Sequence, residues 1–313
     1  METRRTFLKK SVMGCLAISL SGLTACAAPG TKPGIKNTIP GKALVIWYSQ
    51  TGHTGRIGKV IGHEWRKAGL TVDVCDYRDI PPSTPAGYDL VALGSPVYYM
   101  DVPDNFREWI RGMPAMEGIP VAAFVTYGGH GDGQHNTACG ILEEMARKGA
   151  VPVGMDTFGN MSTFAPTWSM GNEKRILEYK NRPNKQTYAR AQQFAIDLLE
   201  IVRAGRTLHI DREFGMDTLG RLLPQIWLTK LLITNHHIDA GECIECGLCQ
   251  EKCPVDAIDL QNNTIDHHTC LVCMGCINNC PVGAVKMKFM GRDVYGFEKF
   301  LKQHQIKIME PEL

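Results

Sequence analysis

Cysteine spacing is the feature of this 313-residue sequence that points most directly to chemistry. Of its 12 cysteines, eight fall between Cys243 and Cys280, and the pattern Cys-x-x-Cys-x-x-Cys-x-x-x-Cys-Pro begins at Cys243 and again at Cys270. A disulfide framework would spread its cysteines along a shorter chain to close loops. A closed zinc site needs only four ligands and does not account for the third cysteine or for Cys-Pro. The pattern therefore favours iron–sulfur clusters over either alternative.

The same spacing resembles that of the bacterial two-cluster ferredoxins. In that family, three cysteines at intervals of three residues and one distant cysteine before proline hold each 4Fe–4S cluster. The resemblance implies that one cluster is held by Cys243, Cys246, Cys249 and Cys280, and the second by Cys270, Cys273, Cys276 and Cys253. Two clusters leave little room for a substrate pocket in so small a module, so we expect it to conduct electrons.

A second candidate site follows an apolar run of strand length at residues 43–48. The loop is rich in hydroxyl groups and glycine, and its residues are Ser49, Gln50, Thr51, Gly52, His53 and Thr54. Backbone N–H groups and the helix dipole make a helix N-terminus a good anion site. The loop resembles the flavodoxin motif Ser/Thr-x-Thr-Gly-x-Thr, which holds the phosphate of FMN. The alternative is an ordinary turn that caps a helix. No NAD(P) or NTP motif is present.

Two later loops are expected beside the same ligand, because ligands of open parallel sheets bind at the carboxyl ends of the strands. Their candidate residues are Ser95, Pro96, Val97, Tyr98 and Tyr99 in one loop, and Tyr127, Gly128, Gly129, His130, Gly131 and Asp132 in the other. In flavodoxin-like proteins these loops flank the isoalloxazine. The tyrosines could stack on the flavin or simply pack at the surface. His130 and Asp132 could act as a general acid and base. The simpler alternative is that both are solvent-exposed loop residues without a catalytic role.

The elements that must position these loops form an α/β pattern. Five apolar runs, at 43–48, 71–75, 90–93, 121–125 and 151–155, alternate with helix-like stretches such as 56–67. This alternation predicts a doubly wound parallel sheet. The resemblance to flavodoxin covers residues 42–204 and implies strand order 2-1-3-4-5. A small α+β two-cluster ferredoxin domain is then expected at 239–285.

The remaining segments are assigned by composition and periodicity. Residues 158–171 form an insertion that could be a lid over the flavin or a packing element, and a helix near 173–204 is interrupted near Pro183. Residues 205–238 are expected to form a helical connection. Its apolar helix at 218–233 packs between the domains or, as the alternative, lies in a membrane interface. Residues 286–313 are assigned to a C-terminal tail.

The N-terminus reads as an export leader. An arginine pair, a 14-residue apolar stretch and a small-residue segment ending in Cys26 follow one another within residues 1–26. The arginine region resembles a twin-arginine signal, and the segment at Cys26 resembles a lipobox whose cysteine is lipidated. Residues 27–41 would then be a tether. We expect an extracytoplasmic protein held to the membrane by lipid at Cys26. The alternative is a cytoplasmic leader with a chance arginine pair.

Composition and charge exclude several classes of protein. The chain is 44% hydrophobic, and its 34 basic and 32 acidic residues give a formal net charge of +2. The chain therefore has neither the composition of an intrinsically disordered protein nor the excess of basic residues typical of a nucleic-acid-binding protein. Residues 239–285 contain seven acidic residues and one lysine, so the formal net charge of this segment is 1 − 7 = −6. A redox partner with a basic docking surface is expected to meet this face.

Together these features resemble a flavodoxin–ferredoxin fusion that carries FMN and two 4Fe–4S clusters. The expected function is electron transfer between FMN, the clusters and a redox protein or the membrane quinone pool. One alternative is an FMN-dependent oxidoreductase that acts on a small molecule such as a quinone or porphyrinogen. Another is a flavin-free docking module on a tethered ferredoxin. The sequence leaves open whether the chain is an enzyme.

Overall fold

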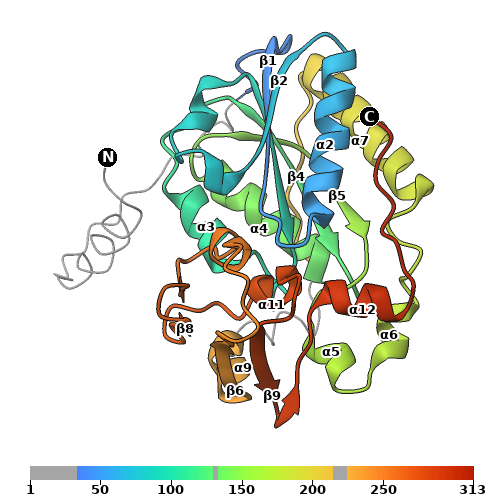
Figure 1. The fold of residues 1–313 in the computed structure, drawn as a ribbon. Coiled ribbons are helices and arrows are strands. Elements are labelled where there is room, and N and C mark those ends of the chain that lie inside the picture. Colours follow the sequence, from blue (N-terminus) through green and yellow to red (C-terminus); the bar gives the residue numbers. More distant parts are fainter. Residues whose placement is uncertain (1–33, 130–132, 214–223) are drawn as a thin grey trace, which may run out of the picture. The chain divides into compact units, whose positions relative to one another are not determined.

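The first half of the protein is built around a parallel sheet (Figure 1). The computed structural model describes residues 34–129, 133–213 and 224–313. The order of the sheet is β2-β1-β3-β4-β5, and adjacent strands pair in parallel register. The strands are β1 (Lys42–Trp47), β2 (Thr71–Asp76), β3 (Leu90–Pro96), β4 (Pro120–Tyr127) and β5 (Val151–Gly159). The predicted sheet and its 2-1-3-4-5 order are confirmed.

Helices cover both faces of this sheet, which explains the unbroken apolar runs. One face packs on α2 (His53–Lys67) and α7 (Lys185–Arg203), and the other on α3 (Asp104–Arg111) and α4 (Gly133–Ala146). Side chains of β1 alternate between the two cores, so Val45 contributes to the first and Ile46 to the second. Short 3-10 turns, η1 (Tyr77–Asp79) and η2 (Thr84–Gly87), connect β2 to β3.

The helical region after β5 is divided as the proline predicts. It consists of α5 (Pro166–Ser169), α6 (Glu173–Leu177) and α7, with Pro183 before α7. Asn184 caps α7: its side chain accepts from the backbone of Thr187, and the Thr187 hydroxyl accepts from the backbone of Asn184. This capping box sets where the last helix begins.

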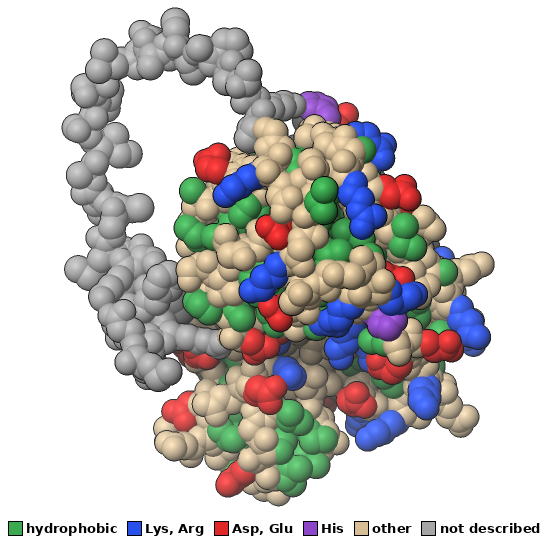
Figure 2. All heavy atoms as spheres, turned by 90° about the horizontal axis from the view of Figure 1, so that it is seen from above, with side chains coloured by type: hydrophobic (Ala, Val, Ile, Leu, Met, Phe, Trp, Pro, Cys, Tyr) green, Lys and Arg blue, Asp and Glu red, His purple; other side chains and the backbone are tan. Residues whose placement is uncertain are grey.

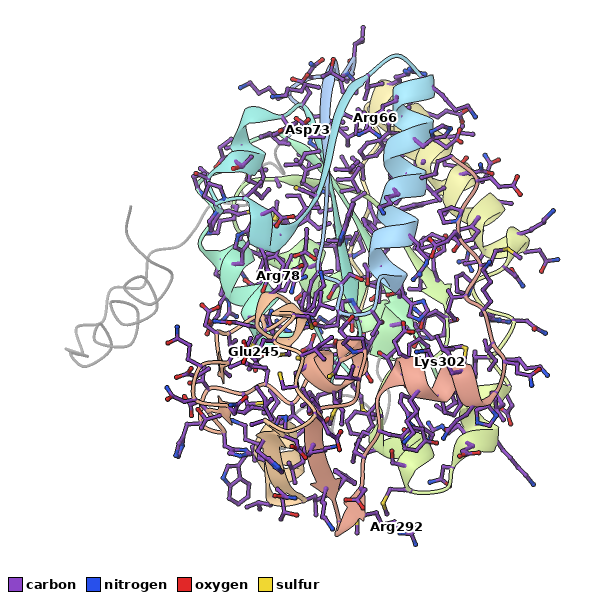
Figure 3. All side chains as sticks on the ribbon, in the orientation of Figure 1. Arg66, Asp73, Arg78, Glu245, Arg292 and Lys302 are labelled. Atoms are coloured by element: carbon purple, nitrogen blue, oxygen red, sulfur yellow. The ribbon has the colours of Figure 1, made fainter. Side chains whose placement is uncertain are left out.

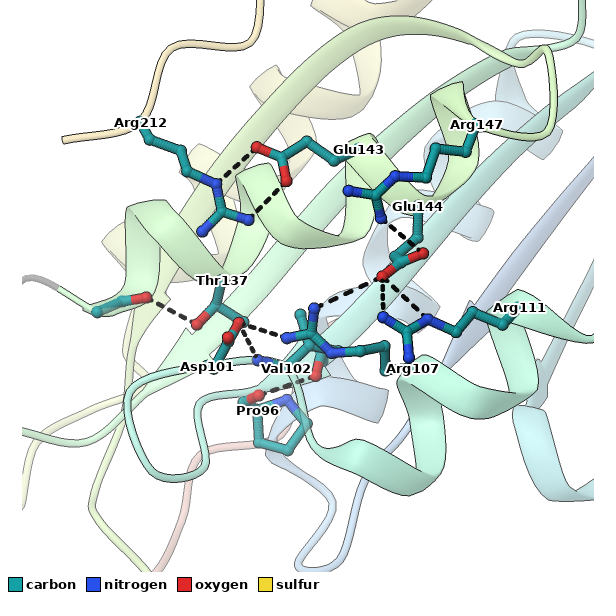
Figure 4. Close-up of polar contacts among 12 residues, drawn as sticks. Pro96, Asp101, Val102, Arg107, Arg111, Thr137, Glu143, Glu144, Arg147 and Arg212 are labelled. Atoms are coloured by element: carbon teal, nitrogen blue, oxygen red, sulfur yellow. Dashed lines mark hydrogen bonds and ion pairs between the residues drawn. The ribbon is translucent and has the colours of Figure 1, made fainter. Parts of the chain in front are cut away.

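An ion-pair cluster ties the outer helices together (Figure 4). Glu144 on α4 is only 4% exposed and pairs with Arg107 and Arg111 of α3 and with Arg147. Burial raises the pKa of the Glu144 carboxyl, but the hydrogen bonds from Arg111 and Arg147 outweigh burial and leave that pKa below its ordinary value. Arg212 pairs with Glu143 in the same way and holds the segment after α7 against α4.

A second module completes the chain. It contains a three-stranded antiparallel sheet, β10-β9-β6, and the β7–β8 pair. Its strands are β6 (Ile233–Ile238), β7 (Ile258–Asp259), β8 (Thr264–Ile265), β9 (Val285–Phe289) and β10 (Arg292–Asp293), and its helices are α10 (Leu248–Glu251), α11 (Gly275–Asn279) and α12 (Phe297–Gln303).

This module extends beyond the cysteine motifs at both ends. Strand β6 pairs with β9, so residues before and after the motifs close into one sheet. Of the apolar stretch 218–233 that predicts one helix, residues 218–223 lie outside the described part. Gln225–Leu231 form α9, and Ile233 begins β6. The helix ends before Ile233 because the backbone from that residue onward pairs with β9 as a strand.

The insertion at 158–171 packs against the second module. Trp168 is buried, its indole N–H donates to the carbonyl oxygen of Tyr295 at 2.9 Å, and its ring lies 4.9 Å from that of Phe300. Met161 and Ile176 belong to the same apolar core as the second module's own buried residues. The insertion is therefore a packing element, and some of its residues also line the cavity described below.

The C-terminal segment returns to the first domain, running from α12 beside α7 and α2 (Figure 1). Glu310 pairs with Arg56 at 2.6 Å, and the Tyr188 hydroxyl donates to the carbonyl oxygen of Met309. Acidic and basic side chains are interspersed on the face seen in Figure 2. Among the residues that the structure describes, no helix is both long and apolar enough to cross a bilayer.

Candidate functional site

A cavity of about 480 Å³, here called the sheet-edge cavity, opens at the carboxyl ends of the parallel strands. It gathers most of the residues predicted to bind a flavin: Ser49, Gln50, Thr51, His53, Thr54, Pro96, Val97, Tyr98, Tyr99, Tyr127 and Gly128. Gly52, Ser95 and Gly129 lie in the same loops but do not line it. His130, Gly131 and Asp132 are outside the described residues. Three loops far apart in sequence thus meet at one place.

The first loop forms an anion site at the start of α2. Gly52 has a φ of 82°, a left-handed conformation that a residue with a side chain rarely adopts, and it directly precedes this 15-residue helix. Thr54 is buried, and its hydroxyl lies 2.8 Å from that of Thr126 on β4. Arg175 also lines the cavity and brings a positive charge. The loop and Arg175 suit a phosphate group.

Buried polar atoms at this cavity lack partners within the described part of the chain. They are Oε1 of Gln50 and both ring nitrogens of His53. Burial, with repulsion from Arg56, lowers the pKa of His53 to about 3, so its ring is neutral at pH 7. Because an unpaired buried polar atom costs about 1–3 kcal/mol, these atoms fit a polar ligand in the cavity. The residues present fit FMN.

A strained turn carries the two tyrosines. Tyr98 and Asp101 form a two-residue hairpin in which Tyr99 and Met100 have φ of 50° and 62°. Asp101 fixes the turn: its carboxylate accepts from the Val102 backbone N–H and pairs with Arg107, both at 2.7 Å (Figure 4). Conformations of this kind persist only where neighbouring contacts enforce them. The turn therefore holds Tyr98 and Tyr99 rigidly at the cavity.

The glycine in the next loop has a packing role. A Cβ on Gly128 would lie 2.2 Å from the backbone nitrogen of Ser162. The absence of a side chain at Gly128 therefore lets its loop pack closely against the insertion. Residues of this insertion form another wall of the cavity: Asn160, Ser162, Thr163 and Thr167. The sequence predicts the insertion only as a whole, as a lid over the flavin or a packing element, because these individual wall residues follow no motif.

The eight clustered cysteines separate into two groups of four. Cys243, Cys246, Cys249 and Cys280 line one small cavity, and Cys253, Cys270, Cys273 and Cys276 line another. These are the two groups that the ferredoxin spacing implies. We call the first the distal cluster site and the second the proximal cluster site. Burial raises the pKa of the Cys273 thiol to about 12, so a bound cation is needed to hold it as a thiolate.

The two cluster sites repeat one backbone design. The motifs are offset by 27 residues, since 270 − 243 and 280 − 253 both equal 27. In each half the cysteine before proline accepts a hydrogen bond from the N–H four residues later, at 3.2 Å: Cys253 from Ala257 and Cys280 from Ala284. Left-handed residues also recur at this offset, as in Gly247 and Met274. Backbone N–H groups directed at the sulfurs stabilise the negative charge of a cluster.

The proximal cluster site shares a wall with the sheet-edge cavity. Cys273 and Val272 line both cavities. Tyr48, at the end of β1, acts on the Cys273 thiol and opposes the rise of its pKa, and the Tyr48 hydroxyl accepts from Gln50 Nε2 at 2.8 Å. None of the described residues at the distal cluster site lines the sheet-edge cavity. The proximal site is therefore the one beside the flavin position.

Side chains other than the cysteines fix this arrangement. Arg78, labelled in Figure 3, follows β2; its guanidinium donates to the carbonyl oxygens of Lys252 at 3.0 Å and Ser49 at 3.3 Å, and it pairs with Asp76. Asn279 on α11 donates to the carbonyl oxygen of Gln50 at 3.0 Å. Sequence analysis missed Arg78, Asn279 and Tyr48, since only the fold brings them to the boundary.

Comparisons with known proteins agree with the two-part architecture. The flavodoxin domain family matches residues 44–155, and the 4Fe-4S binding domain family matches residues 236–259. A flavodoxin domain and a 4Fe–4S ferredoxin motif are thus present in one chain. The flavodoxin domain implies FMN, and the two sets of four cysteines are consistent with two clusters.

Individual relatives match part of the chain. NAD(P)H dehydrogenase (quinone) from Caulobacter vibrioides is 25% identical over 146 residues, covering 37% of this chain and 71% of the relative. The protein of the same name from Acidovorax ebreus is 26% identical over 145 residues, covering 36% and 70%.

Solved structures match about half of the chain. A flavodoxin from the domain Archaea is 19% identical and covers 52% of this chain and 99% of its own, with a TM-score of 0.38. The Streptococcus pneumonia TIGR4 flavodoxin is 18% identical and covers 51% and 98%, with a TM-score of 0.41.

Proposed function

We propose that this chain, an electron-transfer flavo-iron-sulfur protein, carries electrons in series between FMN, the proximal cluster and the distal cluster. One observation carries the order: Cys273, a proximal cluster ligand, lines the cavity that fits FMN. When bound, FMN exchanges one or two electrons and each 4Fe–4S cluster exchanges one. The protein's own residues hold the two sites in contact and exclude water between them, since Tyr48 and Met274 are buried.

The distal cluster site is the proposed exchange point for an external redox protein. Cys246 is exposed there, and Ile244 beside it is 60% exposed. Glu245 is also exposed, whereas Glu242 and Glu251 pair with Lys286 and Lys252. An apolar patch with an acidic rim suits a partner with a basic rim. A transfer rate to the partner that falls as ionic strength rises would support this surface, and a rate independent of salt would count against it.

The leader supports a proposed location outside the cytoplasm. Its arginine pair and the segment ending at Cys26 resemble export and lipidation signals. A Cys26→Ala variant should lose incorporation of labelled palmitate and appear in the soluble fraction. Replacement of Arg4 and Arg5 by lysine should leave the chain in the cytoplasm. Labelling of the Cys26→Ala variant would refute the anchor.

The serial order is tested by removing one cluster at a time. Anaerobically purified full-length protein should contain about one FMN and about eight irons per chain. Cys253→Ala removes a proximal ligand, and Cys280→Ala removes the distal ligand at the equivalent position of the repeat. After a light flash reduces the flavin, the distal cluster of Cys253→Ala should stay oxidised, while the proximal cluster of Cys280→Ala should bleach as in the wild type.

A third variant controls for general effects of cysteine loss. Cys75 lies on β2, outside both cluster sites, so Cys75→Ala should keep both clusters and the wild-type rate. Reduction of the distal cluster in Cys253→Ala at the wild-type rate would refute the serial order. Eight irons without flavin would favour the flavin-free alternative.

A second candidate function is oxidation or reduction of a small molecule at the flavin. Two observations favour it: the curated relatives are named NAD(P)H dehydrogenase (quinone), and a further cavity adjoins both redox sites.

A further inference from the structure

A cavity of about 500 Å³, here called the side cavity, lies between the Tyr98–Asp101 turn, the start of α3 and α9. Its apolar lining includes Tyr98, Tyr99, Val102, Ile226, Trp227 and Leu271. This volume falls in the range of small-molecule sites, which are mostly apolar with a few placed polar groups. Neither the family matches nor the cofactors account for it.

The position of the side cavity is unusual because it adjoins both redox sites. Tyr98 and Tyr99 also line the sheet-edge cavity, and Leu271 also lines the proximal cluster site. A single layer of side chains therefore separates the side cavity from the sheet-edge cavity and from the proximal cluster site. A molecule bound there would lie within electron-transfer reach of FMN and of the proximal cluster.

One buried polar atom at this cavity has no partner among the described residues. It is Oδ1 of Asn105, at the start of α3. The Asn105 Nδ2 group donates to the Tyr77 hydroxyl at 2.7 Å, which leaves Oδ1 as the unpaired atom of this amide. An unpaired buried acceptor in the wall of a largely apolar cavity favours a ligand that brings a hydroxyl donor.

Aromatic side chains at the side cavity suit contact with a flat aromatic ligand. Trp227 is 58% exposed although it is large and apolar, and it lies at the cavity beside Ile226. Tyr98 and Tyr99 form the opposite wall, on a turn that Asp101 holds in place. Contacts between aromatic rings stabilise binding beyond the effect of the area that they bury.

We propose that the side cavity binds a hydroquinone, with one hydroxyl donating to Asn105 Oδ1 and the ring lying between Trp227 and the tyrosines. The proposal rests on the electron-transfer function above. In the reaction, the hydroquinone loses two electrons and two protons and becomes the quinone. A bound FMN would supply the two-electron acceptor; the two protons released by the hydroquinone would pass to water near Asp104, an exposed lining residue, and two protons from water would complete the reduced flavin. The balance is hydroquinone plus FMN giving quinone plus FMNH₂.

Binding is tested with a probe that cannot transfer electrons in the assay. We would titrate the full-length protein, loaded with FMN and clusters, with 1-naphthol by calorimetry under nitrogen. A parallel titration with 1-methoxynaphthalene removes the hydroxyl donor but keeps the ring. We expect 1-naphthol to bind about fivefold more tightly, the value of one net hydrogen bond of about 1 kcal/mol.

Three variants locate the probe. Ile226→Trp fills the side cavity and should weaken 1-naphthol binding at least tenfold. Leu231→Trp places the same ring on the same helix at a residue that is 60% exposed and does not line the cavity, so it should leave binding unchanged. Asn105→Leu keeps the shape without the acceptor and should remove the preference for 1-naphthol over the methyl ether. Flavin and cluster spectra should match the wild type in all three.

Several results would overturn the proposal. They are the absence of 1-naphthol binding to the wild type up to its solubility limit, equal affinity in wild type and Ile226→Trp, or an unchanged preference in Asn105→Leu. Because 1-naphthol binding requires no electron transfer, it can persist when the serial order fails. Conversely, internal transfer after a flash can proceed normally when no naphthol binds, so the two failures are distinguishable.

Discussion

The guanidinium of Arg78 donates to the carbonyl oxygen of Lys252 at 3.0 Å and so joins the flavodoxin domain to the residue before Cys253. The same guanidinium reaches the carbonyl oxygen of Ser49, the first residue of the phosphate loop. One side chain therefore contacts both the anion site and the proximal cluster site. A hydrogen bond from a charged donor is worth about 1.5–3 kcal/mol.

Arg78→Ala should loosen the boundary between the modules. We expect a loss of about 2 kcal/mol in the free energy of unfolding and a slower transfer from flavin to the proximal cluster. Arg66→Ala is the matched control, since Arg66 also donates to a carbonyl oxygen, that of Val72, but within the first domain (Figure 3). Urea denaturation and flash photoreduction measure the two effects. Equal transfer rates in both variants would contradict a role for Arg78 in positioning the cluster.

Tyr48→Phe should lower the reduction potential of the proximal cluster. Its buried hydroxyl lowers the pKa of the Cys273 thiol against the effect of burial, and a donor beside a cluster sulfur stabilises the reduced, more negative cluster. Loss of about 1 kcal/mol corresponds to a fall on the order of 40 mV for one electron. Redox titration followed by EPR measures this shift. The neighbouring Tyr77→Phe should leave the potential unchanged; a shift of equal size there would point to a general packing effect.

His53 should make the flavin-free protein sensitive to mild acid. Its pKa falls from the ordinary 6.5 to about 3 on folding, so the unfolded chain binds the proton more readily than the folded chain. Stability is therefore fully present above pH 6.5 and falls as the pH drops toward 3. Between pH 7 and pH 5 we expect a loss of about 2 kcal/mol.

The His53→Asn variant should lose this pH dependence, while His209→Asn, a substitution at an exposed histidine, should keep it. Thermal midpoints of flavin-free protein at pH 5, 6 and 7 provide the comparison. An identical slope in wild type and His53→Asn would show that other groups cause it.

Gly128→Ala should disturb the wall between the flavin loop and the insertion. The added Cβ would meet the Ser162 backbone nitrogen at 2.2 Å, and backbone cannot move aside as a flexible side chain can. We expect a loss of about 1–3 kcal/mol in stability together with weaker FMN binding. At Gly129 the nearest atom to a Cβ is 3.9 Å away, so Gly129→Ala should change neither quantity. Fluorescence titration with FMN and thermal unfolding would show whether the two variants differ.

Local pattern was enough to determine the strands of the parallel sheet and the types of site. Apolar runs such as 43–48 define strands because a strand covered on both faces must be apolar throughout. The cysteine spacing specifies two sets of four ligands because cluster chemistry depends on short sequence intervals. The loop from Ser49 to Thr54 can be recognised because an anion site needs hydroxyl groups and glycine at a helix start.

Only the tertiary structure decided how these sites face one another. That Cys273 lines the flavodoxin cavity, that Arg78 reaches Lys252, and that Tyr98 and Leu271 share a further cavity all depend on how α11 and α9 pack against the strand ends. Strand β6 was missed because residues 233–238 become a strand by pairing with β9, more than 45 residues later. Such contacts are set by burial and shape between distant segments, which leave no periodic signal in the sequence.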